Sequence, residues 1–429
     1  MKTKKALFVT AFALFSLFFG AGNLILPPLL GFRSGNLWWL VAMGFCLSAV
    51  LVPICGILAH AKLQGTIYDF AKKVSPNFSW VYALLIYSIS IALPSPRTAA
   101  VTHEIAIAPL FGTPPLATSV CYFVLVFIFV LNRSKILDGI GKVLTPTIIL
   151  MLLALIGSTL LGQEYVFGLS SFENPFSEGI LEGYQTFDAI GAVVVGGVII
   201  ISIDLKYPNA PYSEKKSLVR KAGLLAGFGL LLIYTGLIVT GALAHGAFEA
   251  TVSRTALLNG ISTQNLGSGA NMILSILVSS ACFTTAVGIV TGTADVAKHC
   301  FKGSQKAYVA ATGIGCVLGI VMGQFDVSYI ISVALPILMI IYPITIALII
   351  LNVLPDKYTS TTVFRGVIIV TGIFSIPDFM ASIGLGEGIL FLQHLIPLSS
   401  FGMAWVLPAV IAFVVMNFMS RPSTIKTGD

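Results

Sequence analysis

Charged residues are scarce in this chain. Only 10% of its 429 residues are Asp, Glu, Lys or Arg, whereas 57% are hydrophobic. A soluble protein of this length would need many more charges to cover the surface that faces water. The composition therefore excludes an ordinary soluble globular protein.

Several motifs that carry redox or catalytic chemistry are also absent. The six cysteines have no paired spacing, so we predict neither a disulfide framework nor a zinc site. No glycine-rich loop ending in Gly-Lys-Ser/Thr occurs, which argues against nucleotide hydrolysis. His-Glu-x-x-His and Gly-x-Ser-x-Gly are missing too, which disfavours the alternative of a membrane-embedded enzyme. We predict no enzymatic activity and no organic cofactor, and a passive channel, which would lack trans-stimulated exchange, stays open as an alternative.

Long apolar stretches are what the sequence has instead. A helix needs about 20 largely apolar residues to cross a hydrocarbon core of roughly 30 Å, and about twelve stretches meet this requirement. They cover residues 6–30, 37–59, 80–102, 115–131, 143–162, 184–203, 222–245, 270–294, 307–323, 328–351, 362–380 and 400–419. We therefore predict an all-α integral membrane protein in which residues 1–429 form a single transmembrane domain.

The distribution of basic residues supports this count. Lys and Arg accumulate on the cytoplasmic side of membrane proteins. With the N terminus inside and alternating crossings, all but three of the 24 basic residues fall in cytoplasmic segments. The exceptions are Arg33 and Arg254, on the outer side, and Arg97, within a span. Both termini are therefore predicted to be cytoplasmic, and the net charge of +7 needs no nucleic-acid partner.

Two of the apolar stretches are interrupted by glycine or proline. Residues 19–28 read FGAGNLILPP, and residues 183–192 read GYQTFDAIGA. Unpaired backbone groups at membrane depth are tolerated only where they face protein or a wet cavity. Each break taken alone is also compatible with a kinked and tightly packed helix.

The two breaks are separated by five spans, which is the spacing of an inverted repeat of five helices. We predict such repeats at residues 6–162 and 184–351. In these repeats the half-helix ends and the freed carbonyls form the substrate site near the middle of the membrane. A substrate carboxylate would meet helix N termini there, and an ammonium would meet exposed carbonyls.

A pair of threonines in the span 270–294 suggests a cation site. Ala281, Thr284 and Thr285 follow the i, i+3, i+4 spacing and so share one helical face. One carbonyl and two hydroxyls from this face, with carbonyls from the break at 19–28, would surround a small hard cation with oxygen atoms. The simpler alternative is that the two hydroxyls bond back to their own helix.

Two charges are predicted to lie inside the membrane. Burying Arg97 costs at least about 2.5 kcal/mol by insertion scales, which argues for a partner or a cavity. Glu104 and Asp188 are its candidate partners, and its role is left open between a gate, a substrate-carboxylate site and a structural ion pair. Asp188 is a candidate proton carrier, sodium ligand or acceptor for a substrate ammonium.

Four motifs, in this order and spacing, resemble the branched-chain amino acid:cation symporter family. They are FGAGNLILPP, PSPRTA (residues 94–99), GYQTFDAIGA and ACFTTAVG (residues 281–288), and the resemblance covers essentially the whole chain. It implies the leucine-transporter fold of the amino acid-polyamine-organocation superfamily, with five-plus-five inverted repeats, discontinuous helices 1 and 6, and two further helices at 362–420. It also implies import of leucine, isoleucine and valine with Na⁺ by alternating access across the bacterial inner membrane. Proton coupling, or another neutral amino acid as substrate, is the alternative within the superfamily.

The first-helix motif is also similar to that of sodium:neurotransmitter symporters, and this match implies a set of Na⁺ ligands. They are the carbonyls of Ser16, Phe19 and Ala281 and the hydroxyls of Thr284 and Thr285. At the fold's other sodium site Asp188 stands where a hydroxyl is expected, so the resemblance does not extend to a second sodium ion.

The resemblance also implies substrate contacts from both breaks and from the buried arginine. The predicted contact residues are Phe18, Ala21, Gly22, Asn23, Arg97, Phe187, Asp188 and Gly191. The expected partners are the amino acid and the lipid bilayer, with no nucleic acid and no obligate protein partner.

Overall fold

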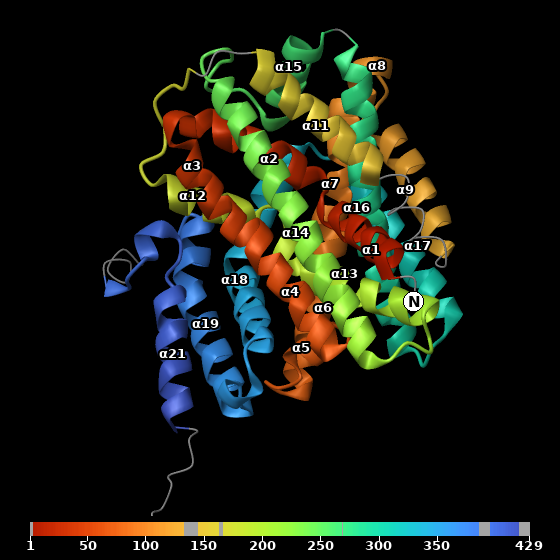
Figure 1. Cartoon of the computed structure of the whole chain (residues 1–429), viewed down its shortest axis with the longest axis vertical. Coiled ribbons are helices and arrows are strands. Elements are labelled where there is room, and N and C mark those ends of the chain that lie inside the picture. The colour runs from red at the N-terminus through yellow and green to blue at the C-terminus, as the bar shows by residue number, and fades with distance from the viewer. Residues whose placement is uncertain (1–2, 133–144, 163–165, 268, 386–394, 420–429) are drawn as a thin grey trace, which may run out of the picture. The chain divides into compact units, whose positions relative to one another are not determined.

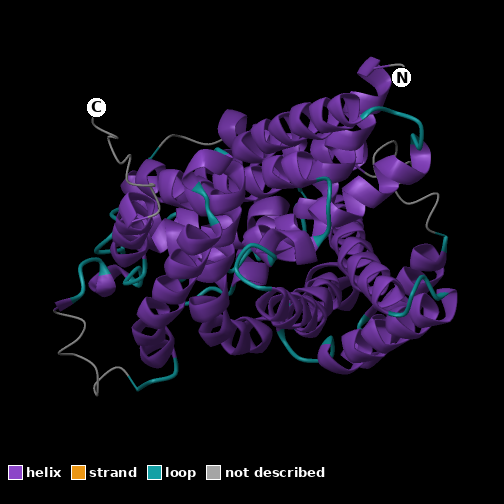
Figure 2. Ribbon diagram, turned by 90° about the horizontal axis from the view of Figure 1, so that it is seen from below, coloured by secondary structure: helices purple, strands orange, loops and turns teal. Residues whose placement is uncertain are grey.

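The computed structural model describes residues 3–132, 145–162, 166–267, 269–385 and 395–419. These residues form helices joined by loops, and no strand occurs among them (Figure 2). Nine helical runs in this part of the chain are long and apolar enough to cross a membrane. Two shorter apolar helices, α9 (Pro115–Leu131) and α21 (Val406–Met419), add to them. The all-α membrane class is confirmed, whereas the number of twelve spans stays a prediction.

The described residues form two compact units. The first is drawn from residues 1–66 and 85–334, and the second from residues 67–84 and 335–429. Two helices, α6 (Pro76–Ala92) and α18 (Val327–Val353), contribute residues to both units.

The other helices of the first unit contain both predicted breaks (Figure 1). In chain order they are α1 (Thr3–Phe18), α2 (Ala21–Ser34), α3 (Trp38–Cys46), α4 (Val52–Leu63), α7 (Pro94–Val101), α8 (Ala108–Phe111), α9, α11 (Thr145–Gly162), α12 (Pro175–Tyr184), α13 (Asp188–Lys206), α14 (Tyr212–Leu243), α15 (Arg254–Leu266), α16 (Ala270–Cys300) and α17 (Gln305–Met322). The long helix α14 packs along both α1 and α2, and α16 contacts α1, α7 and α13. Helices from distant parts of the chain therefore surround the two breaks.

The first break separates α1 from α2. Gly20 has an extended backbone (φ −118°, ψ −159°), and its N–H donates to Asn23 Oδ1 at 3.4 Å. A Cβ atom at Gly20 would lie 2.5 Å from Thr285 Oγ1, so only glycine lets α16 approach the break this closely. The break predicted from the glycines and prolines is confirmed, although Pro27 and Pro28 themselves lie inside α2.

The second break separates α12 from α13. Phe187 adopts a left-handed backbone conformation (φ 63°), which is uncommon for a residue other than glycine. The Thr186 hydroxyl joins the two half-helices, because it donates to Gly183 O at 2.7 Å and accepts from the Asp188 N–H at 3.2 Å. This predicted break is also confirmed.

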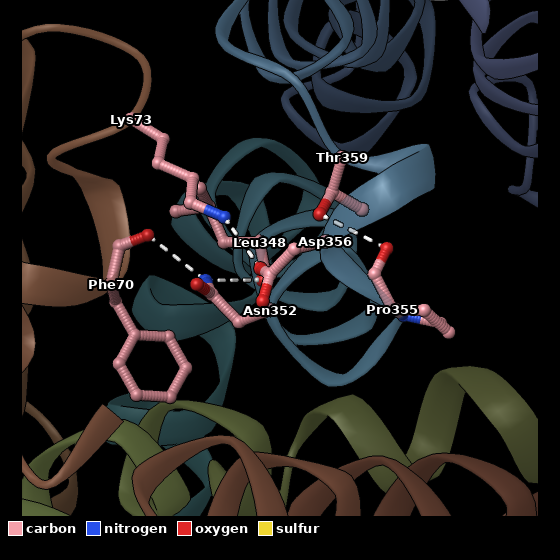
Figure 3. Close-up of polar contacts among 7 residues, drawn as sticks. All are labelled: Phe70, Lys73, Leu348, Asn352, Pro355, Asp356 and Thr359. Atoms are coloured by element: carbon pink, nitrogen blue, oxygen red, sulfur yellow. Dashed lines mark hydrogen bonds and ion pairs between the residues drawn. The ribbon is translucent and has the colours of Figure 1, made fainter. Parts of the chain in front are cut away.

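The second unit contains α5 (Ile67–Ala71), parts of α6 and α18, α19 (Thr361–Ser382) and α21. Figure 3 shows how α5 and the segment after it are held: Asn352 donates to Phe70 O at 2.9 Å, and Lys73 pairs with Asp356 at 3.0 Å. Asn352 is buried, whereas both partners of the ion pair are exposed to solvent. The buried amide therefore contributes more to this connection than the exposed charges do.

Candidate functional site

The two breaks meet at a cavity in the first unit. Its lining comes from α1, α2, α7, α13, α16 and the residues of both breaks, namely Leu17, Phe18, Gly20, Ala21, Gly22, Asn23, Pro94, Arg97, Thr98, Thr186, Phe187, Asp188, Gly191 and Thr285. All eight residues predicted to contact the substrate are among them. The cavity volume is about 30 Å³, which is room for roughly two water molecules. A bound amino acid would therefore require the lining side chains to move apart.

Arg97 lies at one side of this cavity, on the first turn of α7, and is 2% exposed. Its Nη1 donates to Gln185 O at 2.7 Å, so the guanidinium satisfies a carbonyl that the second break leaves free. The guanidinium carbon lies 5.1 Å from the centre of the Phe187 ring. Its Nε has no hydrogen-bond partner among the described residues. A buried guanidinium with a free donor beside a cavity can bind an anionic group.

Asp188 supplies the opposite charge. It is the first residue of α13, is 3% exposed and interacts electrostatically with Arg97. Its Oδ2 accepts from Asn23 Nδ2 at 2.6 Å and from the Tyr234 hydroxyl at 3.2 Å. The Asn23 amide also donates to the Tyr234 hydroxyl oxygen. The cavity therefore has a basic and an acidic side chain, the two groups that could pair with the carboxylate and the ammonium of a zwitterion.

Glu104, which the sequence made a candidate partner of Arg97, has a different role in the structure. Its Oε1 accepts from the Val327 N–H at 2.8 Å, at the start of α18. The carboxylate thus stabilises a helix N terminus, where negative charge is favourable. Of the two candidates, only Asp188 lies with Arg97 at the cavity.

Tyr234 and Thr186 are site residues that sequence reasoning missed. Tyr234 is a fully buried residue of α14 with no glycine, proline or charged residue directly beside it to mark it. Thr186 left a usable signal, because it is a hydroxyl residue within a break, where a side chain can replace lost backbone bonds.

Oxygen atoms of α1 and α16 converge next to the cavity. Thr284 Oγ1 lies 2.8 Å from Ser16 O and 2.9 Å from Ala281 O, and Ser16 Oγ lies 3.0 Å from the same hydroxyl. Thr285 Oγ1 lies 3.4 Å from Leu17 O and also lines the cavity. These neutral carbonyl and hydroxyl oxygens fit the ligand preference of a small hard cation.

Phe19 differs from the other predicted cation ligands. Among the described residues, the hydrogen bonds between the end of α1 and α16 involve Ser16 and Leu17. The Phe19 ring instead stacks on Phe15 and on Tyr234, with ring centroids 5.5 Å and 6.0 Å away. The structure thus brings Ser16 and the three α16 residues together and adds the Leu17 carbonyl and the Ser16 hydroxyl, which the sequence did not suggest.

Two discontinuous helices around a membrane-embedded, charged cavity define the class of protein as a membrane transporter. The chain belongs to the family described as branched-chain amino acid transport protein, whose model matches residues 3–423. It is 33% identical over 422 residues to the branched-chain amino acid permease BraB of Bacillus subtilis (strain 168), a match that covers 95% of this chain and 94% of that protein. The protein is therefore a transporter and not an enzyme.

Two solved structures share its fold. A Na⁺-coupled sialic acid symporter in a substrate-bound outward-open state has a TM-score of 0.60 at 12% identity, covering 97% of this chain and 90% of that one. MhsT in complex with L-phenylalanine has a TM-score of 0.57 at 17% identity, covering 96% of this chain and 98% of that one. These identities show the fold alone, and they confirm the expected leucine-transporter fold.

Proposed function

We propose that this protein imports leucine, isoleucine and valine together with Na⁺ by alternating access. One observation carries the proposal: Arg97 and Asp188 face a single cavity that Thr285 connects to the converging oxygens of α1 and α16. A zwitterionic substrate and a small cation would thus bind to adjoining groups. Family membership and the name of the permease BraB support the choice of substrate.

The charges suggest how an amino acid would lie in the site. Its carboxylate would bind Arg97 Nε and the first amides of α2, which have no acceptor within their own helix. Its ammonium would bind Asp188. The branched side chain would then pack against Phe18 and Phe187, the aromatic residues of the cavity lining.

Sodium would bind as the second transported species, between the break in α1 and helix α16. Its ligands would be the carbonyls of Ser16 and Ala281 and the hydroxyls of Thr284 and Thr285, with the Phe19 carbonyl as the fifth expected ligand. The hydroxyls now bond to carbonyls, so a bound cation would replace these hydrogen bonds with direct coordination. The fold shared with a Na⁺-coupled symporter supports this choice of ion.

The topology belongs to the same proposal. Residues 6–162 and 184–351 would form the two inverted repeats, which would exchange access to the site between the two membrane faces. The protein would lie in the bacterial inner membrane with both termini in the cytoplasm, as its basic residues suggest. Its partners would be the amino acid and the bilayer lipids alone.

Proton coupling is the second candidate, and the buried carboxylate of Asp188 favours it. Purified protein in liposomes separates the two ions when inward Na⁺ and H⁺ gradients are imposed one at a time. The proposal expects uptake of labelled leucine, isoleucine and valine to need the Na⁺ gradient. Equal uptake in choline buffer with an inward proton gradient would establish proton coupling instead.

A further inference from the structure

Tyr234 takes part in the site without reaching the cavity. It lies in α14, has no exposed surface and is absent from the cavity lining. Its ring stacks on Phe19 at 6.0 Å between centroids and meets Phe45 edge-on at 5.4 Å. Its hydroxyl contacts Asn23 and Asp188, which come from the two broken helices. One side chain of a continuous helix thus contacts both breaks.

The donors and acceptors of this group form a closed ring. Asn23 Nδ2 carries two hydrogens, of which one goes to Asp188 Oδ2 and the other to the Tyr234 hydroxyl oxygen. The hydroxyl then directs its own hydrogen to Asp188 Oδ2. The Gly20 N–H fixes the amide orientation, because it donates to Asn23 Oδ1. Oδ2 therefore acts only as an acceptor in this ring.

This ring leaves the two oxygens of Asp188 with different roles. Oδ2 is held by two donors, one of which lies outside the cavity lining, whereas the side chain as a whole lines the cavity. Oδ1 takes no part in this ring and is the oxygen assigned to a ligand; Thr186, which also interacts with the carboxylate, lines the same cavity. Two bonds to one oxygen also fix the plane of the carboxylate, and a fixed plane aims Oδ1 in one direction.

We propose that Tyr234 is a positioning residue for the substrate ammonium, acting through Asp188. It keeps the carboxylate oriented, so that Oδ1 forms a charge-assisted hydrogen bond with the ammonium of an amino acid. The proposal rests on the proposed function, since it needs an amino acid in this cavity. It adds that the selectivity for ligands bearing an ammonium depends on a hydroxyl that never touches them.

The test is Tyr234→Phe in the full-length purified protein. The substitution keeps the ring and its contacts with Phe19 and Phe45, and removes only the hydroxyl. The first measurement is equilibrium binding of labelled leucine. The second is competition by 4-methylpentanoate, which has the shape and carboxylate of leucine but no ammonium. We expect the leucine Kd to rise about tenfold, as for the loss of one hydrogen bond to a charged group, with competition by 4-methylpentanoate unchanged.

Tyr82→Phe is the matched control. Tyr82 is also buried, and its hydroxyl bonds Thr345 Oγ1 at 3.0 Å in the second unit, so its loss should leave the leucine Kd unchanged. An unchanged Kd in Tyr234→Phe, or equal weakening of both ligands, would overturn the positioning role while the transport function stands. A wild-type protein that binds none of leucine, isoleucine and valine would overturn both proposals.

Discussion

Replacing Gly22 by alanine should disable the substrate site by displacing Arg97. A Cβ atom at Gly22 would lie 2.5 Å from Arg97 Nη2, 3.1 Å from its Cζ and 3.4 Å from Gln185 O. A real Cβ does not approach another atom to 2.5 Å, so the guanidinium must move. It has little freedom to do so, because it is buried, bonded to Gln185 O and placed against the Phe187 ring.

The size of the effect follows from the hydrogen bond that moves with the guanidinium. A hydrogen bond to a charged group contributes about 1.5 to 3 kcal/mol, and about 1.4 kcal/mol corresponds to a tenfold change in an equilibrium constant. Replacing glycine by alanine inside a helix returns up to about 1 kcal/mol of helix propensity, so folding should be affected less than the site. We expect the KM for leucine to rise at least about tenfold while the melting temperature stays within a few degrees of wild type.

Leucine uptake into liposomes measures this effect, and Gly191→Ala is its control. Gly191 also lines the cavity, but a Cβ there would meet only the Phe18 ring, at 3.9 Å, which is ordinary van der Waals contact. It therefore adds the same methyl group to the cavity without touching Arg97. If Gly22→Ala transported with the wild-type KM, or no worse than Gly191→Ala, the placement of Arg97 would not matter and the reasoning would be refuted.

Three further predictions concern the cation, the buried charge and the second unit. Thr284→Ala and Thr285→Ala should each raise the Na⁺ concentration for half-maximal leucine uptake, which a Na⁺ titration measures. Thr285→Ser keeps the hydroxyl and should have a smaller effect. Both alanine variants should also raise the KM for leucine at low Na⁺, and this rise should shrink at high Na⁺. Asp188→Asn should lower leucine uptake at least about tenfold at normal membrane expression, because it removes the charged partner of the ammonium. Asn352→Leu should destabilise the fold by about 1 to 3 kcal/mol, measured as a lower melting temperature, since it removes a buried amide that makes two hydrogen bonds, to Phe70 O and Leu348 O.

Two of these predictions have a control within the chain. Thr291 is another fully buried threonine of α16, and its hydroxyl has no partner among the described residues, so Thr291→Ala should leave the Na⁺ dependence unchanged. Lys73→Ala breaks a solvent-exposed ion pair and a cation–π contact with the Phe364 ring, and should change stability by less than about 1 kcal/mol. If both Thr→Ala variants had the Na⁺ dependence of wild type, the two threonines would not be cation ligands. Normal uptake by Asp188→Asn would show that the charge of Asp188 is not needed for transport. Equal melting temperatures for Asn352→Leu and wild type would show that the Asn352 side-chain amide does not contribute to stability.

The breaks were accessible to sequence reasoning because their causes are local. A Cβ at Gly20 would collide with Thr285 of a neighbouring helix, so glycine alone permits this close contact, and a glycine in an apolar stretch can be read directly. Asp188 and Arg97 could be identified from the sequence for a related reason. A charge in the middle of an apolar stretch is costly, so its presence alone implies a partner or a cavity.

The partners of these residues could not be chosen in the same way. Glu104 and Asp188 were both candidates for Arg97, because spacing along one helix gives proximity within that helix and says nothing about another. The structure uses Glu104 at the start of α18 and places Asp188 beside Arg97, 91 positions further along the chain. Tyr234 could not be predicted at all, because the sequence around a single tyrosine in an apolar stretch is the same whether the tyrosine packs in a core or belongs to a site.

By itself, the amino-acid order determined the membrane class, the all-helical fold and the positions of both breaks, because hydropathy and the backbone limits of glycine and proline act over a few neighbouring residues. It also placed seven of the eight predicted substrate residues at or beside those breaks, and the eighth, Arg97, within another apolar span. Only the tertiary structure decided that they line one cavity, that the carbonyls of Ser16 and Leu17 accept hydrogen bonds from α16, and that the Tyr234 hydroxyl bonds Asp188. Those outcomes depend on how helices from distant parts of the chain pack against each other, and helix packing is set by the fit of whole surfaces, which no local pattern encodes.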